Sequence, residues 1–316
     1  MRKNLKINLL WFLIATLGFA LITILQSVGI INAFAVQIIM QIGINLILAV
    51  GLNLIIGFSG QFSLGHAGFM AIGAYSGAII GIQNPTYAGF ALSVIIGMLI
   101  SGVIALIVGI PTLRLKGDYL AIATLGVSEI IRIVIVNGGS LTNGPAGLFG
   151  IPAFTTWQLV YVLAVLSTIL TLNVIRSSTG RAILSVREDE IAAESMGVWT
   201  TKYKVLAFVF GAMTASIAGA LYAGFIQTVT PKDFTFMKSI DILIIAVFGG
   251  LGSITGTVIA AVVLGILNMY LQNFGDLRMI IYSLALIIVM IFRPGGLLGT
   301  KEFSLKQLLA KTKEAK

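Results

Sequence analysis

The chain has 316 residues, of which 58% are hydrophobic and only 10% are charged, whereas ordinary globular domains carry about 25% charged residues. A soluble core cannot absorb this apolar excess, so most of the chain is expected to lie in lipid. The net charge of +9 does not indicate nucleic-acid binding, because the basic residues recur at the ends of apolar segments instead of forming one patch. The absence of cysteine excludes disulfides and thiolate sites.

Apolar segments recur along the whole chain, and a helical membrane span needs roughly 20 apolar residues. Ten spans are predicted, with both termini cytoplasmic: Ile7–Leu25, Phe34–Ile56, Leu64–Ile82, Tyr87–Ile110, Tyr119–Val136, Trp157–Ile175, Val205–Gln227, Ile240–Phe248, Thr257–Leu271 and Met279–Phe292. Two of these are short, so eight spans plus a re-entrant pair in 240–271 is an alternative. The fold class is therefore an all-α polytopic membrane protein, with 1–316 as one transmembrane domain.

The basic residues set the orientation. With both termini inside, the cytoplasmic segments hold sixteen Lys and Arg residues and the outer segments hold three. This asymmetry is the one that the positive-inside rule describes. It places the charged loop 176–204 and the tail 293–316 in the cytoplasm.

The loop 176–204 carries the signature of a short helix. Ser185 and Glu188 have capping-box spacing, and the acidic run Glu188 to Glu190 suits a helix N-terminus. Gly197 suits a left-handed C-terminal stop. A helix of roughly two turns is marginal alone, so we expect it to pack against another protein.

Two glycine-rich stretches, 57–66 and 249–256, interrupt the apolar pattern at corresponding places in the two halves of the chain. Broken apolar segments paired across halves indicate a transport path, and the path candidates are Ser59, Gln61, Ser63, His66 and Ser253. The alternative interpretation is two glycine turns at the cytoplasmic surface. His66, the single histidine, is either a proton-handling or ligand-binding group or a hydrogen-bonded structural residue.

Glu129 and Arg132 are an opposite-charge pair inside a predicted span, at the spacing where helical side chains meet. We expect them to stabilise each other, and a role in the path is the alternative. Small residues at four-residue spacing, such as Gly73/Gly77/Gly81 and Gly211/Ala215/Gly219, predict close helix packing. The chain contains no phosphate loop and no clustered catalytic or metal-ligand set.

At the charged loop and beyond, the chain resembles a known family. The runs GRAILSVREDEIAAESMG, SGQFSLGHAGFMAIGAY, LRLKGDYLAIATLGVSEIIRIV, LTNGPAGLFGIP, FGGLGSITGTVIAA and FRPGGLLG are similar to the LivM-type permeases of branched-chain amino acid ABC importers. The resemblance implies a cell-membrane subunit without cofactor or metal. It would pair with a homologous permease, two ATP-binding cassette subunits and an extracellular solute-binding protein.

The resemblance also implies a coupling helix that docks on the ATPase through an E-A-A-x-x-x-G pattern. Ala192, Ala193 and Gly197 match the pattern, while Ile191 stands in the Glu position between Glu190 and Glu194. The predicted coupling residues are Arg187, Asp189, Glu190, Ala192, Ala193, Glu194 and Gly197. Alternating access is the expected mechanism. The alternatives are a permease for urea, short amides or another small polar solute, a passive channel and a membrane enzyme.

Overall fold

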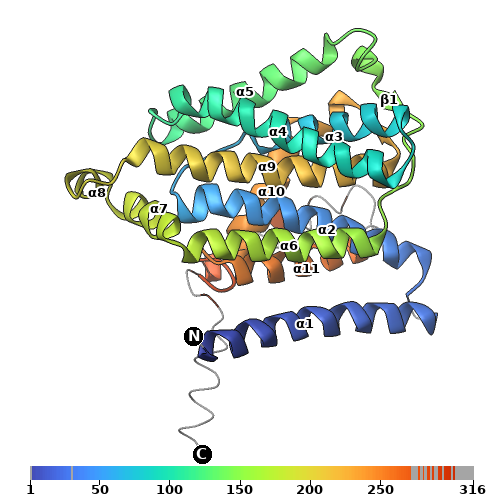
Figure 1. Cartoon of the computed structure of the whole chain (residues 1–316), viewed down its shortest axis with the longest axis horizontal. Coiled ribbons are helices and arrows are strands. Elements are labelled where there is room, and N and C mark those ends of the chain that lie inside the picture. The colour runs from blue at the N-terminus through green and yellow to red at the C-terminus, as the bar shows by residue number, and fades with distance from the viewer. Residues whose placement is uncertain are drawn as a thin grey trace, which may run out of the picture.

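The computed structural model describes residues 2–29 and 31–271, together with separate residues and short runs between 277 and 302. Long helices lie side by side with their axes roughly parallel, and most of the loops gather at the two ends of the bundle (Figure 1). The long helices are α1 (Arg2–Ser27), α2 (Ala33–Asn53), α3 (His66–Gln83), α4 (Tyr87–Thr112), α5 (Asp118–Val136), α6 (Trp157–Arg176), α9 (Thr200–Ile226) and α11 (Ile254–Leu271).

The shorter elements lie between these helices. They are a π-helical turn that extends α2 (Leu54–Phe58), α7 (Ser178–Glu188), α8 (Glu190–Ser195), α10 (Phe236–Gly249) and the 3-10 turns Gly144–Ala146 and Pro231–Phe234. Two residues of β1 (Leu148–Phe149) pair antiparallel with β2 (Thr228–Val229). This small ladder joins two loops at the end of the bundle opposite α8 (Figure 1).

Six of the described helices are long and apolar enough to cross a membrane, which confirms an all-α polytopic membrane fold. They are Ala33–Phe58, Tyr87–Thr112, Asp118–Val136, Trp157–Arg176, Thr200–Ile226 and Ile254–Leu271. The predicted count of ten stays a prediction. The segment Ile240–Phe248 belongs to α10, whose 14 residues are fewer than the roughly 20 that a span needs, and Met279–Phe292 lies largely outside the described residues.

The core of the bundle is the contact between α3 and α9. A methyl group at Gly73 would collide with the backbone of Ser216, and one at Gly219 would collide with the backbone of Met70. Helices associate in lipid without a hydrophobic driving force, so close backbone approach supplies the van der Waals contact instead. The small residues of these two helices therefore pack within the subunit, as their spacing predicts.

The first helix is attached at the edge. The ring of Phe19 packs against Trp157 and Tyr161 of α6, with ring centroids 5.1 Å and 5.7 Å apart. Figure 1 shows α1 along one side of the bundle and α5 along the other.

Candidate functional site

The charged segment 176–204 is mostly helical, and its first helix was not foreseen. Ser177 begins α7, because its hydroxyl accepts a hydrogen bond from the Gly180 amide at 3.2 Å. The predicted capping box at Ser185 is wrong. Ser185 lies within α7, and its hydroxyl donates to the Ala182 carbonyl at 2.9 Å. A helix is already present at Ser185 because the apolar residues Ile183 and Val186 of α7 are buried against the bundle.

The second, shorter helix is the one that the acidic run and the glycine predict. Asp189 is extended and caps α8, since its carboxylate accepts hydrogen bonds from the amides of Ile191 (2.9 Å) and Ala192 (3.0 Å). At the other end Gly197 has φ +81°, and the Val198 amide donates to the Ala193 carbonyl at 3.0 Å. A left-handed glycine followed by this bond is a common helix stop.

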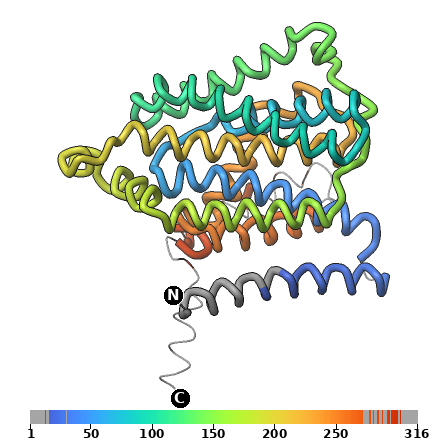
Figure 2. Tube along the Cα trace, in the orientation of Figure 1, coloured from blue at the N-terminus to red at the C-terminus, as the bar shows by residue number. Residues whose placement is uncertain are grey.

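Helix α8 projects beyond the end of the bundle, as the olive-coloured loop at the left of Figure 2 shows. Ala193 faces inward and is buried, whereas Ala192 and Glu194 are exposed. Three large apolar side chains around α8 are exposed: Ile191 (75%), Met196 (84%) and Trp199 (72%). Exposed apolar side chains that gather on one projection indicate an interaction surface. We call these three residues the α8 knob.

An ion cluster anchors the start of α8. The Glu190 carboxylate lies 2.5 Å from Lys204 Nζ on α9 and 3.4 Å from Lys116 Nζ in the loop between α4 and α5. Burial acts to raise the pKa of Glu190, but the hydrogen bonds and positive charges of Lys204 and Lys116 outweigh it and lower the pKa. Glu190 is therefore ionised at neutral pH and ties α8 to two other parts of the bundle.

Arg187 connects α7 to the glycine-rich stretches. Its Nη1 donates to the Gly57 carbonyl at 2.6 Å, at the end of the π-helical turn, where carbonyls lack helical partners. The side chain also passes close to Gly60 and Gly252, where an added Cβ would lie 3.0 Å from its Cγ and Nη1 atoms respectively. One arginine thus touches both stretches and stands two residues before the cap of α8.

The two glycine-rich stretches meet, although Gly57 and Gly252 are 195 positions apart in the sequence. Asn53 joins them: its Nδ2 donates to the Ser253 carbonyl (3.0 Å), the Gly250 carbonyl (3.2 Å) and the Thr257 hydroxyl (2.5 Å). Its Oδ1 accepts from the Gly252 amide at 2.9 Å. A Cβ at Gly57 would collide with the Gly252 nitrogen. The sequence reasoning missed Asn53, whose only signal is an amide within an apolar run.

The break after α2 carries the predicted path residues into the bundle. Residues 60–65 are not helical, yet Ser59, Gln61, Ser63 and His66 are all buried. Irregular backbone among membrane helices occurs only where protein buries it or a cavity adjoins it. Within the described residues, Gln61 Oε1 and His66 Nε2 are buried without a hydrogen-bond partner, which is typical of groups with a water or functional partner.

The break also brings two helix starts together. The Leu64 amide donates to the Thr124 hydroxyl at 3.0 Å, and the Ala67 amide donates to the Ser239 hydroxyl at 3.1 Å. The first turn of α3 therefore contacts the first turn of α10, and Leu64, which precedes α3, contacts α5. Two interrupted helices that start beside each other are a feature of transporter binding regions.

The remaining candidates are divided between two places. Ser253 is fully buried and belongs to the Asn53 junction. Glu129 and Arg132 form the predicted ion pair, with Arg132 Nη2 2.7 Å from Glu129 Oε2. Both are about one-third exposed on α5, so the structure brings them to the side of the bundle and not to the glycine junction.

These features define a class: a multi-pass helical membrane protein with interrupted helices and a projecting knob at one end. The chain belongs to the family described as "Branched-chain amino acid transport system / permease component", whose model matches residues 34–292. The chain is 36% identical to the high-affinity branched-chain amino acid transport system permease protein LivM of Salmonella typhimurium. It is 35% identical to the protein of the same name from Escherichia coli. Each aligns over 234 residues, 63% of this chain and 55% of the relative.

A second kind of branched-chain amino acid permease protein is also similar. LivH of Salmonella typhimurium is 31% identical over 206 residues, 63% of this chain and 64% of that protein. The chain therefore spans little more than half the length of the LivM relatives. No solved structure matches the chain.

Proposed function

We propose that this chain is the membrane permease subunit of an ATP-driven ABC importer for leucine, isoleucine and valine. The single observation that carries the proposal is the continuous connection from the exposed α8 knob, through Asp189 and Arg187, to the Gly57 carbonyl at the junction of the interrupted helices. The relatives named as branched-chain amino acid permeases supply the substrate class.

The geometry supports alternating access driven from the α8 end. Closure of two ATP-binding cassette subunits would push the knob, and the Glu190 ion cluster would pass the force to α9 and to the α4–α5 loop. Arg187 would move with α7 and pull on the end of α2. Because packed interfaces are bistable and do not deform continuously, a small displacement there suffices to switch the bundle.

The other partners follow from the same proposal. The similarity to both LivM and LivH supports a homologous permease as the second membrane subunit. An extracellular solute-binding protein would deliver the amino acid to the loops 137–156 and around Lys232, at the end of the bundle opposite α8. The protein would reside in the plasma or inner membrane, with the coupling loop and both termini in the cytoplasm. It is a transport subunit that uses no cofactor, and hydrolysis belongs to its partners.

The test of the coupling assignment uses charge on the knob. The substitutions Ile191→Asp and Met196→Asp change side chains that are exposed, so the fold is expected to survive. Both should abolish co-purification of the ATPase subunits and leucine uptake. Leu141→Asp is the matched control for co-purification of the ATPase subunits, because Leu141 is also an exposed apolar residue (59%) but lies in a loop at the opposite end. Normal co-purification and uptake with both knob variants would refute the assignment.

The test of orientation exploits the lack of cysteine. Met196→Cys should react with a membrane-impermeant thiol reagent only in inside-out vesicles, and Leu141→Cys only in right-side-out vesicles. The reverse pattern would overturn the topology.

A further inference from the structure

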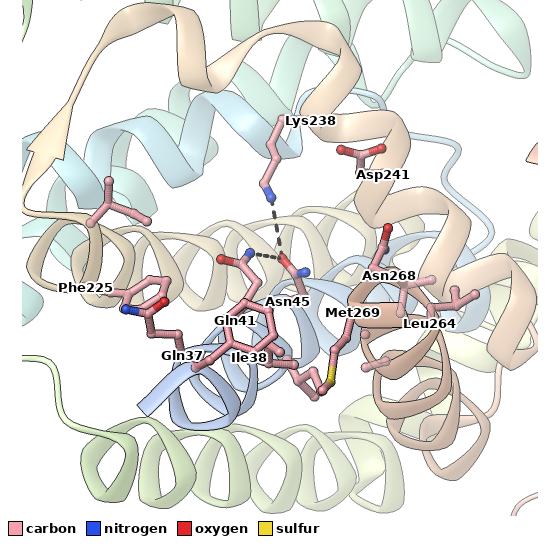
Figure 3. Close-up of a pocket in the computed structure, with 16 residues that line it drawn as sticks. Gln37, Ile38, Gln41, Asn45, Phe225, Lys238, Asp241, Leu264, Asn268 and Met269 are labelled. Carbon is pink, nitrogen blue, oxygen red and sulfur yellow. Dashed lines mark hydrogen bonds between the residues drawn. The ribbon is translucent and has the colours of Figure 1, made fainter. Parts of the chain in front are cut away.

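A cavity of about 470 Å³ lies between α2, α9, α10 and α11, apart from the glycine junction (Figure 3). Its walls combine two kinds of side chain. Apolar residues such as Ile38, Phe225 and Leu264 form one part, and the polar residues are Gln37, Gln41, Asn45, Lys238, Asp241 and Asn268. Its volume falls within the roughly 300–1,000 Å³ of typical small-molecule sites.

Two side chains of opposite charge, Lys238 and Asp241, line this cavity. Lys238 and Asp241 are three residues apart on α10, the spacing that puts side chains on the same helix face. Figure 3 shows the Lys238 side chain extending into the cavity toward Asn45 and Gln41. Its Nζ lies 3.5 Å from Asn45 Oδ1, which also accepts from Gln41 Nε2 at 3.3 Å.

Helix stability does not explain this arrangement. Lys238 occupies the first turn of α10, where the helix macrodipole disfavours a positive charge. Charged groups among membrane helices are costly and mark substrate paths. A lysine and an aspartate on a cavity wall, beside amides with fixed orientations, therefore indicate a ligand that carries both charges.

We propose that this cavity is a binding site for the zwitterion of an aliphatic α-amino acid during its passage. Lys238 receives the carboxylate, and Asp241 receives the ammonium group. Asn45 and Gln41 orient the lysine, and the wall around Leu264 and Phe225 accommodates the branched side chain. This inference rests on the proposed function and deepens it, because neutral urea or a short amide would have no use for the paired charges.

The first experiment measures occupancy directly in the assembled complex. Met269→Cys places a single thiol of this chain on the cavity wall without removing a polar group. Millimolar leucine should slow alkylation of this thiol by a small reagent, whereas leucinamide, which lacks the carboxylate, and urea should not. Leucine should leave alkylation of a Val28→Cys control unchanged, because Val28 is 66% exposed, follows α1 and does not line the cavity. Equal protection by urea, or by an anionic lipid in place of leucine, would overturn the assignment.

The second experiment removes the charges. Lys238→Met and Asp241→Asn should each abolish the protection by leucine and lower leucine transport by about tenfold or more, while ATPase co-purification stays normal. Lys238→Arg keeps the charge and should retain most of the transport, which separates loss of the charge from misfolding.

The result for the wild-type complex distinguishes failure of the binding site from failure of the proposed function. If the wild type imports leucine and both charge-removal variants do so equally well, the binding site is wrong and the importer assignment stands. If the wild-type complex does not import leucine at all, the proposed function fails and this inference fails with it.

Discussion

The contact between Arg187 and Gly57 gives the sharpest prediction about coupling. In Arg187→Met the apolar stem still packs against Gly60, but the charge-assisted hydrogen bond of 2.6 Å to the Gly57 carbonyl is lost. The guanidinium side chain is only 28% exposed, so solvent screens this bond little, and hydrogen bonds to charged groups contribute about 1.5–3 kcal/mol. Because every 1.4 kcal/mol is a factor of ten, the linked arrangement should become roughly 10- to 100-fold less populated.

The assay compares three quantities in proteoliposomes that contain the whole transporter: leucine uptake, ATP hydrolysis and retention of the ATPase subunits. Arg187→Met should lower uptake by about tenfold or more, while the ATPase subunits remain bound and continue to hydrolyse ATP. The matched control is Glu188→Ala, which removes the other ion pair of Arg187 but from a carboxylate that is 71% exposed. Exposed pairs contribute about 0–1 kcal/mol, so this control should transport normally. Wild-type uptake by Arg187→Met would refute the coupling route.

Three further predictions concern the junction and the anchor of α8. Asn53→Leu leaves the buried Gly252 amide unpaired and should lower the free energy of unfolding by about 1–3 kcal/mol. Thermal denaturation of the purified complex would detect this as a lower Tm, and an unchanged Tm would contradict the junction. Gly57→Ala should reduce the yield of folded protein in size-exclusion chromatography, because its methyl group would collide with the Gly252 nitrogen, and a normal yield would contradict that close approach. The lowered pKa of Glu190 means that its pairing with Lys204 is present at neutral pH and is lost as pH falls through the folded-state pKa. Glu190→Gln should therefore destabilise the complex by roughly 1 kcal/mol at neutral pH and by progressively less in acid, and a pH-independent difference in Tm would contradict this.

The structure of the proposed coupling region, 176–204, was predictable in part. Acidic residues followed by small residues and Gly197 correctly indicate a short helix with a left-handed stop. The start of that helix was not predictable from the capping pattern, since Ser185 and Asp189 are both acceptable caps in isolation. Packing decided between them, because Ile183 and Val186 bury against the bundle and extend α7 past Ser185.

The two glycine-rich stretches were visible in the sequence as interruptions of the apolar pattern, but their contact with each other was not. Each stretch reads locally as a turn with polar residues. Only the tertiary structure places Gly57 against Gly252 and shows Asn53 and Arg187 holding the two together. The cavity was not predictable from the sequence either. Its lining comes from four helices, and neither Lys238 nor Asp241 lies in a local motif.

The sequence by itself indicated that most of the chain lies in lipid, and it determined the class of the fold and most helix boundaries. These depend on hydropathy summed along the chain and on local capping chemistry, and both are properties of neighbouring residues. The tertiary structure alone decided which polar groups meet inside the bundle. Such contacts join residues up to about 200 positions apart, as Asn53 and Ser253 show, and their energy depends on distances that no local pattern encodes.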